Sequence, residues 1–172
     1  GFVLDHFADL AGTGPGGGAS ADQLETLTEA YAGFFAEASR PGFGDPPPGE
    51  WTAAQVVAHI AVNDDLMAAV CRGLIHDAAP RFDNAVPNDR AVLQALVEAV
   101  ADLPSLVELG RARAETLRLL LGRLDDDQLA AAVPCHLIDG DRVMVDQPMP
   151  WGSLALVTQA TYHLPLHTRQ LA

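Results

Sequence analysis

The chain has 172 residues, of which about half are hydrophobic and 6% aromatic, and this length predicts a single domain with a substantial core. Its formal net charge is −13, and all ten basic residues are arginine. Because nucleic-acid binding draws its affinity from cations placed on phosphates, this composition argues against a DNA or RNA partner.

The sequence also argues against a membrane protein. No apolar run approaches the roughly 18 residues that a membrane-spanning helix needs. The N-terminal residues lack the basic and then apolar segments of a signal peptide, so we expect a cytoplasmic protein. Cys71 and Cys135 lie far apart without a CxxC motif, which excludes a zinc ribbon or a thioredoxin-type site. We expect both to be free thiols, with Cys71 packed inside a helix.

The first 19 residues are predicted to be separate from the domain. Residues 2–10 could form a short helix, and residues 11–19 form a glycine-rich connector without the GK[ST] ending of a phosphate-binding loop. We therefore place the folded domain at residues 20–172. Its first long helix begins at Ser20 or Asp22, ends at Arg40-Pro41 and is followed by a loop over residues 41–49. The apolar stripe of this helix comprises Leu24, Leu27, Tyr31, Phe34, Phe35 and Ala38.

A second helix is predicted to begin at Thr52. Gln55 follows three residues later, which is the capping-box spacing, and Trp51 would pack on Val56 as a hydrophobic staple. The core face of this helix is strongly apolar, and His59 lies within it. We expect this histidine to point into the protein interior.

The middle of the chain is predicted to be mostly helical. We expect a loop over residues 77–87 and one long helix over residues 88–124, bent at Pro104. Residues 125–127, three aspartates, suit the start of a short helical turn. The period then changes to that of strands, and residues 136–145 predict a small hairpin around an Asp-Gly turn, closed by Pro148 and Pro150.

The last helix carries two histidines four residues apart, His163 and His167. A spacing of four places both rings on one helix face, one turn apart. The core-facing stripe comprises Ser153, Leu156, Ala160, His163, His167 and Leu171. Each buried ring then needs a hydrogen-bond partner or a metal, because burial of an unpaired polar group is costly. Pro165 lies between them and removes one backbone hydrogen bond, so it could distort this face.

Four long helices with a small hairpin before the last one predict an all-α, four-helix bundle. Facing helices of such bundles commonly hold metal ions. The spacing of His163 and His167 alone is as well explained by packed, hydrogen-bonded rings. His59 on a second helix favours a metal site built from all three.

Two motifs in this order resemble the DinB family: Trp51-Thr52-x-x-Gln55 leading to His59, and His163-x3-His167-x2-Gln170-Leu171 about a hundred residues later. The resemblance covers residues 20–172. It implies an up-down-down-up bundle with a divalent metal, nickel or zinc, on His59, His163 and His167. The N-terminal domains of mycothiol-dependent maleylpyruvate isomerases are related to this family. They often have glutamate where this chain has His163, which argues against that particular reaction here.

Three neutral imidazoles would leave at least one coordination position of the ion open, as a catalytic site requires. A water or a thiol bound there would lose its proton near neutral pH. Asn63 or Asp64 could act as an outer partner or proton acceptor, although a solvated or helix-pairing role explains them as well. We expect Trp51 to be a core residue rather than a substrate platform. His6, His76 and His136 are not expected to be ligands.

The sequence leaves three functions open. The first is a metal-dependent enzyme, a thiol transferase or isomerase using a low-molecular-weight thiol or a hydrolase, with no catalytic side chain assigned beyond the metal ligands. The second is a non-catalytic module that binds a metal or a small ligand. The third is a structural bundle, which could form a homodimer and in which the histidines simply pack.

Overall fold

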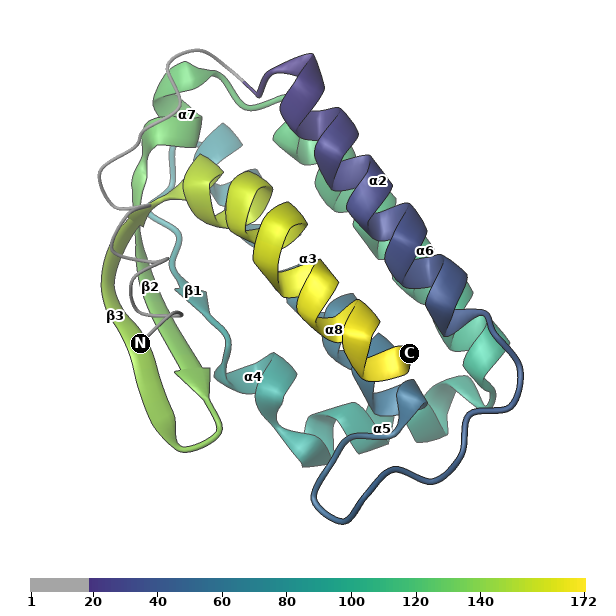
Figure 1. Cartoon of the computed structure of the whole chain (residues 1–172). Helices are drawn as coiled ribbons and strands as arrows, with labels where there is room; N and C mark the ends of the chain where they lie inside the picture. Colours follow the sequence, from purple (N-terminus) through teal and green to yellow (C-terminus); the bar gives the residue numbers. More distant parts are fainter. Residues whose placement is uncertain (1–18) are drawn as a thin grey trace.

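The computed structural model describes residues 19–172, shown in Figure 1. The elements in chain order are α2 (Ala21–Ala38), α3 (Ala53–Ile75), β1 (Phe82–Asp83), α4 (Ala85–Asn88), α5 (Arg90–Val100), α6 (Leu103–Leu121), α7 (Asp126–Ala130), β2 (Ala132–Asp139), β3 (Arg142–Pro150), the π-helix η1 (Ser153–His163) and α8 (Leu164–Leu171). The described chain is therefore mostly helical, with one small sheet. The predicted short helix at residues 2–10 and nearly all of the connector lie outside the described residues.

Both predicted helix starts are confirmed by reciprocal hydrogen bonds. The amide of Gln23 donates to the Ser20 hydroxyl at 3.1 Å, and the Gln23 side chain accepts from the Ser20 amide at 3.1 Å. Thr52 and Gln55 repeat this arrangement at the start of α3. Capping boxes satisfy amides that the first helical turn would otherwise leave unpaired. They fix where α3 begins, and so which of its residues face inward.

Helix α3 is the most enclosed element. It packs along α6 and contacts α5 and α8, while α2 packs along α6 and along η1 and α8 (Figure 1). Six consecutive residues of α3, 56–61, are buried, so this part of the helix is surrounded by protein on all sides. His59 is one of the six. No helix within residues 19–172 has both the length and the hydrophobicity needed to cross a bilayer.

The predicted long helix over residues 88–124 is wrong in one respect, because it is two helices. Helix α5 ends at Val100, and Ala101 adopts a left-handed conformation with φ of 74°. Asp102 then caps α6 by accepting from the Ser105 amide at 2.7 Å. Pro104 lies in the first turn of α6, where its missing amide proton has no helical partner to lose. Pro104 therefore follows the break between two helices and does not bend a continuous one.

The predicted hairpin is confirmed, but its strands are longer than expected and a third strand joins them. Strands β2 and β3 pair antiparallel, with Gly140 in the turn at φ of 57°, and β1 pairs parallel with β2. Pro148 and Pro150 lie inside β3 rather than after it. Since β3 is at the edge of the sheet, prolines are tolerated there. Strand β1 and helix α4 also occupy residues predicted to be a plain loop.

One side chain fastens the tip of this hairpin to the helices. Asn84 donates from Nδ2 to the carbonyl oxygen of Ile138 at 3.1 Å, and its Oδ1 accepts from the Ile138 amide at 2.7 Å. The Asn84 side chain thus pairs with the backbone of β2 as a neighbouring strand would. It does so where the register of β2 and β3 shifts, between Leu137 and Ile138. The hairpin tip is held against α4 as a result.

We expect Asn84→Ala to lower the free energy of unfolding by about 1–3 kcal/mol, because the Ile138 amide and carbonyl groups both lose their partner. Urea denaturation measures the loss, and hydrogen exchange should accelerate at the Ile138 amide. Asn88→Ala is the matched control, since it removes a single bond, from Nδ2 of Asn88 to the Asn84 carbonyl oxygen. Equal effects of the two variants would contradict the special role of Asn84.

Candidate metal centre

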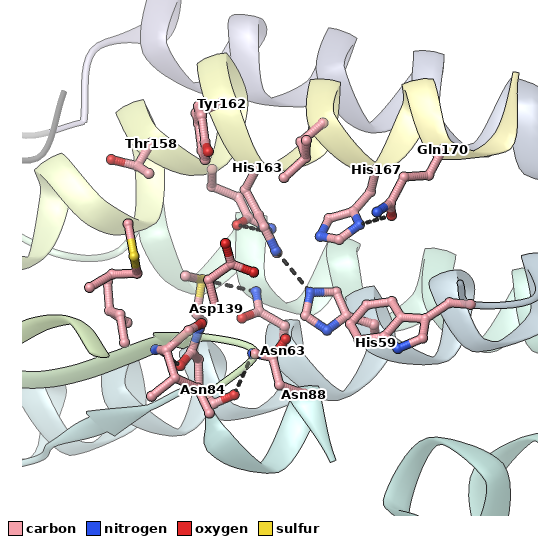
Figure 2. A pocket seen from close by; sticks show the side chains of 18 of the residues that line it. His59, Asn63, Asn84, Asn88, Asp139, Thr158, Tyr162, His163, His167 and Gln170 are labelled. Carbon is pink, nitrogen blue, oxygen red and sulfur yellow. Dashed lines mark hydrogen bonds between the residues drawn. The ribbon is translucent and has the colours of Figure 1, made fainter. Parts of the chain in front are cut away.

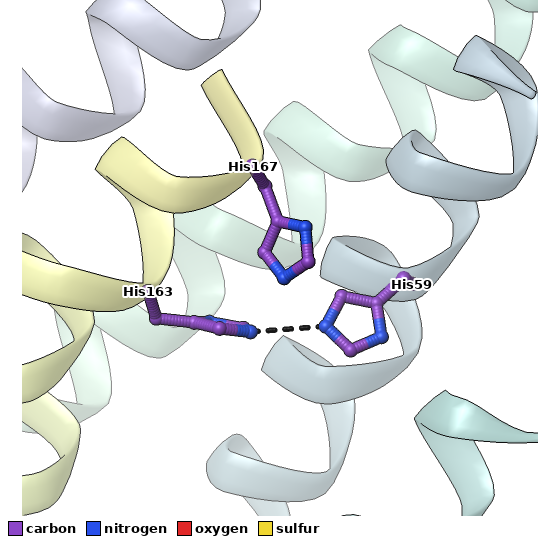
Figure 3. Close-up of side chains that lie close together, drawn as sticks. All are labelled: His59, His163 and His167. Atoms are coloured by element: carbon purple, nitrogen blue, oxygen red, sulfur yellow. Dashed lines mark hydrogen bonds between the residues drawn. The ribbon is translucent and has the colours of Figure 1, made fainter. Parts of the chain in front are cut away.

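Three histidines from two distant segments meet inside the protein (Figure 3). His59 comes from the middle of α3, His163 ends η1, and His167 lies in α8. One potential ligand atom from each lies within 4.8 Å of the other two. The rings of His59 and His167 are buried, with 3% and 5% exposure, and His163 is half-buried. The three residues predicted from sequence are therefore brought together.

Pro165 does not separate the pair because the helix changes its winding just before it. Residues 153–163 form a π-helix, in which Thr158 Oγ1 donates to the Ser153 carbonyl oxygen five residues back at 3.0 Å. An α-helix begins at Leu164 and has Pro165 in its first turn. Proline is well accommodated at such a position. The rings of His163 and His167 stay 4.7 Å apart, centroid to centroid.

Each histidine ring is oriented through its Nδ1 atom by a carbonyl oxygen. The contacts are His59 Nδ1 with Pro87 O at 2.7 Å, His163 Nδ1 with Gln159 Oε1 at 2.8 Å, and His167 Nδ1 with Gln170 Oε1 at 2.6 Å. A carbonyl oxygen can only accept, so Nδ1 of each neutral ring carries the proton. The lone pair of each ring is then on Nε2. This is the usual way in which a protein prepares histidines for a metal.

The lone pairs create an electrostatic problem that a cation would solve. Nε2 of His59 lies 2.9 Å from Nε2 of His163. With both Nδ1 atoms protonated, neither Nε2 of a neutral pair has a proton to donate, and two lone pairs repel. Imidazole nitrogens bind Zn²⁺ at about 2.0–2.1 Å, which puts two ligands of a tetrahedral ion about 3.3 Å apart. The spacing of the three residues fits a divalent ion.

Burial keeps these rings neutral. Desolvation, with a smaller contribution from the charge of His167, lowers the pKa of His59 to about 3. Desolvation also lowers the pKa of His163 well below its usual value, followed by repulsion from the other two rings. The pKa of His167 is lowered by desolvation, although its bond to Gln170 works in the opposite direction. Neutral imidazole is the form that binds metals.

A sequence model of the DinB superfamily matches residues 23–171. The chain belongs to the DinB superfamily. Comparisons with curated proteins and with solved structures gave no match. The family resemblance predicted from the motifs is thus confirmed over nearly all of the described residues.

In this DinB-superfamily chain, a buried polar network supports His163. Gln159 Nε2 donates to Asp64 Oδ1 at 3.0 Å and to the Tyr31 hydroxyl oxygen at 3.2 Å, while its Oε1 faces His163. Burial raises the pKa of Asp64 to about 7, although Tyr31, Asn63 and Arg113 oppose that rise. Both Asn63 and Asp64 are buried, so the solvated reading of them is wrong. Asp64 reaches His163 only through Gln159.

Sequence reasoning missed Gln159 as a functional residue. Its position four residues before His163 is one helical turn away, and that spacing was the available signal. Gln170 was part of the family motif, but its contact with His167 was not foreseen. The Pro87 carbonyl oxygen could not have been found, because it comes from α4, a helix that the sequence did not predict.

Trp51 covers one side of the histidine cluster. Its ring centroid lies 4.9 Å from that of His59, and it stacks on His167 at 6.1 Å with an interplanar angle of 9°. Trp51 is half-buried and also lines the cavity described below. It is therefore both a packing residue and a wall of the site.

The other histidines lie away from the cluster. His76 caps the end of α3, and the His136 Nδ1 contacts Asp146 Oδ1 at 3.2 Å on the sheet. His6 lies outside the described residues. Cys71 and Cys135 are free and buried, as predicted for Cys71, and burial raises the pKa of each thiol to about 11. Neither is suited to be a nucleophile.

A cavity of about 470 Å³ opens beside the histidines (Figure 2). Its walls come from α3, from η1 and α8, from the α4 region and from the tip of the β2–β3 hairpin. All three histidines line it. An ion on the Nε2 atoms would thus have space for a small molecule next to it, which a closed structural site would not provide.

We expect Gln159→Leu to weaken metal binding by roughly 10–100-fold, because His163 loses the acceptor that fixes its tautomer. Competition with a chromophoric chelator measures the affinity. The double variant Gln159→Glu/Asp64→Asn exchanges the carboxyl and amide groups and should restore most of the affinity. The carboxylate at position 159 accepts from His163, and the amide at position 64 donates to that carboxylate. Equal affinity of the leucine variant and the unaltered protein would contradict this role.

The metal-free protein should become more stable as the pH rises from about 4 to 6.5. The folded histidines hold fewer protons than the unfolded ones in this window, so stability increases with pH. Asp64 acts oppositely, because its raised pKa makes the folded state hold an extra proton between about pH 4 and 7. Asp64→Asn should therefore steepen the rise by up to about 1.4 kcal/mol per pH unit. Urea denaturation across this range tests it, and an unchanged slope would contradict the assignment.

Proposed function

We propose that this chain is a metal-dependent enzyme of the DinB superfamily, with His59, His163 and His167 as the ligands of a divalent ion. One observation carries the proposal: three neutral Nε2 lone pairs converge, and two of them face each other at 2.9 Å. Only a cation makes that arrangement favourable. The adjoining cavity supports a catalytic rather than a structural role for the ion.

We propose nickel or zinc as the metal, since imidazole ligands suit both and their relative supply decides between them. When bound, such an ion acts as a Lewis acid that lowers the pKa of a water or a thiol in its open position. The residues of the chain prepare this chemistry. The Pro87 carbonyl, Gln159 and Gln170 hold the rings in the ligating tautomer, and Trp51 keeps water from one side of the cluster.

The reaction that fits best is transfer of a low-molecular-weight thiol, or an isomerisation that uses it as a cofactor. Hydrolysis is a variant of the same proposal. The maleylpyruvate isomerase reaction is not part of it, because His163 replaces the glutamate often found in those relatives. No side chain beyond the metal ligands is assigned as catalytic, since the buried carboxyl group of Asp64 reaches the site only through Gln159.

The wider organisation belongs to the same proposal. The long helices α2, α3 and α6, together with η1 and α8, would form an up-down-down-up bundle comprising residues 20–172. The cytoplasmic location and the homodimer stay predictions, as does the separation of residues 1–19 from the domain.

The second candidate function is a module that binds a metal or a small ligand without turning it over. The orienting groups around the histidines favour it, because Gln159 and Gln170 are amides rather than acids or bases. A site can therefore be well prepared for metal and still lack a group that transfers protons. Turnover assays distinguish the two candidates.

Metal content is the direct test of the proposed ligands. Untagged protein, purified without a metal column, should contain close to one equivalent of nickel or zinc by elemental analysis. His163→Ala should lower this content at least tenfold, because only two ligands remain. His136→Ala is the matched control, since His136 lies on the sheet and should leave the content unchanged. Metal-free wild-type protein that also fails to take up added Ni²⁺ or Zn²⁺ would contradict the proposal.

Turnover is tested on the metal-loaded protein with a panel of thiol–electrophile pairs and activated esters. The enzyme proposal expects at least one pair to be converted, with the rate lost in His163→Ala and kept in His136→Ala. Stoichiometric metal without any turnover across the panel would favour the binding module instead.

A further inference from the structure

We propose that the cavity beside the histidines binds a small molecule with a protonated amine on an apolar body, and that Asp139 binds the amine. The amine would be the substrate or ligand of the proposed metal site. The proposal rests on the proposed function only because it takes the cavity as the place where that substrate binds. Asp139 is on the tip of the β2–β3 hairpin, and it lines the cavity together with Asn63 of α3 (Figure 2).

In the metal-free protein, the fixed charges of the lining favour a cation. Beside the histidines, the lining contains two carboxylates, Asp139 and Glu50, and a single guanidinium, that of Arg90. Arg90 donates to the Gly49 carbonyl oxygen and so is partly engaged. Within residues 19–172, neither carboxylate takes part in an ion pair. The whole chain carries a net charge of −13, which adds to the negative potential at the entrance.

The hydrogen bonds of the lining side chains support the same class of ligand, because five of these residues donate to other groups of the protein. These donors are Arg90 to the Gly49 carbonyl, Asn84 Nδ2 to the Ile138 carbonyl, Asn88 Nδ2 to the Asn84 carbonyl, Thr158 Oγ1 to the Ser153 carbonyl, and Gln159 Nε2 to Asp64 and Tyr31. These particular donors are therefore engaged within the protein rather than by a ligand. A ligand that donates is complementary to such a lining, and a ligand that only accepts is not.

A buried amide adds a polar group to the wall of the cavity. Asn63 is 3% exposed and lines the cavity. Its Nδ2 faces the Met67 sulfur at 3.7 Å, and a thioether is a weak acceptor. Buried polar groups normally have strong partners. Asn63 has such a partner in the side chain of Asp64, so this amide adds a polar group to the wall without requiring a ligand.

The remaining wall is apolar and limits the ligand to one with a hydrocarbon body. Met67, Phe82, Leu137 and Leu154 contribute buried side chains to it. Pockets of this kind bind ligands through apolar contact and use a few polar groups for orientation. Cation and apolar body together describe an amphipathic amine. A dicarboxylate or a phosphate ester would meet two carboxylates on this wall, with Arg90 as its guanidinium partner beside any bound ion.

The test compares three probes on one hydrocarbon frame: 2-phenylethylamine, 2-phenylethanol and 3-phenylpropanoate. Each is titrated into the protein as purified and after treatment with EDTA, with binding followed by calorimetry and by NMR of cavity methyl groups. We expect the amine to bind at least tenfold more tightly than the alcohol in both samples. Preference for the amine in the EDTA-treated sample shows that coordination to a metal does not cause it.

The deciding variant is Asp139→Asn, which removes the charge and keeps the shape. It should weaken the amine about tenfold and leave the alcohol unchanged. Asp141→Asn is the matched control, because Asp141 makes the same charge change on the same hairpin but does not line the cavity. It should alter neither affinity. Unfolding by urea, compared between the two variants, verifies that both are folded.

Three outcomes would overturn the proposal: equal binding of the three probes, no binding of the amine at millimolar concentration, or equal effects of the two aspartate variants. Metal content is measured on the same samples, so that the two proposals can fail separately. Metal-free protein that still prefers the amine would keep the ligand class and remove the proposed function. Metal-loaded protein that shows no dependence on Asp139 would do the reverse.

Discussion

The structure depends on how three imidazole rings are oriented through their Nδ1 atoms. A backbone carbonyl from Pro87 and two side-chain amides, Gln159 and Gln170, accept from these atoms. Each bond is ordinary when taken alone. Together they direct three lone pairs to one point in the protein interior, where burial also prevents the rings from taking up protons. The protein thus buries three neutral imidazole rings in an arrangement that a bound cation would stabilise.

The surrounding fold explains how these acceptors reach their places. Helix α3 is buried over residues 56–61, so the ring of His59 is only 3% exposed to solvent. The change from π-helix to α-helix at Leu164 keeps His163 and His167 on one side despite Pro165. The short helix α4 then supplies the carbonyl oxygen for His59, while Asn84, at its start, fixes the hairpin tip that completes the cavity. The three histidines, their orienting groups and the adjoining cavity are therefore parts of one packed unit.

The helices and the three histidines could be predicted from sequence because their signals are local. Capping boxes and apolar stripes define α2 and α3, and a spacing of four residues relates His163 to His167. Features that depend on contacts between distant segments could not be predicted. Strand β1 forms only because β2 lies beside it, and the break at Ala101 depends on how α5 and α6 pack. The burial of Asp64 and its link to His163 through Gln159 are likewise tertiary properties.

The central claim is that His59, His163 and His167 bind a single ion together. X-ray absorption at the nickel or zinc edge, on untagged protein as purified, addresses the coordination sphere itself. We expect scattering from three imidazole rings at about 2.0–2.1 Å together with one oxygen or sulfur ligand. A bound metal without imidazole scattering, or an unchanged spectrum after replacing His59 by alanine, would contradict it.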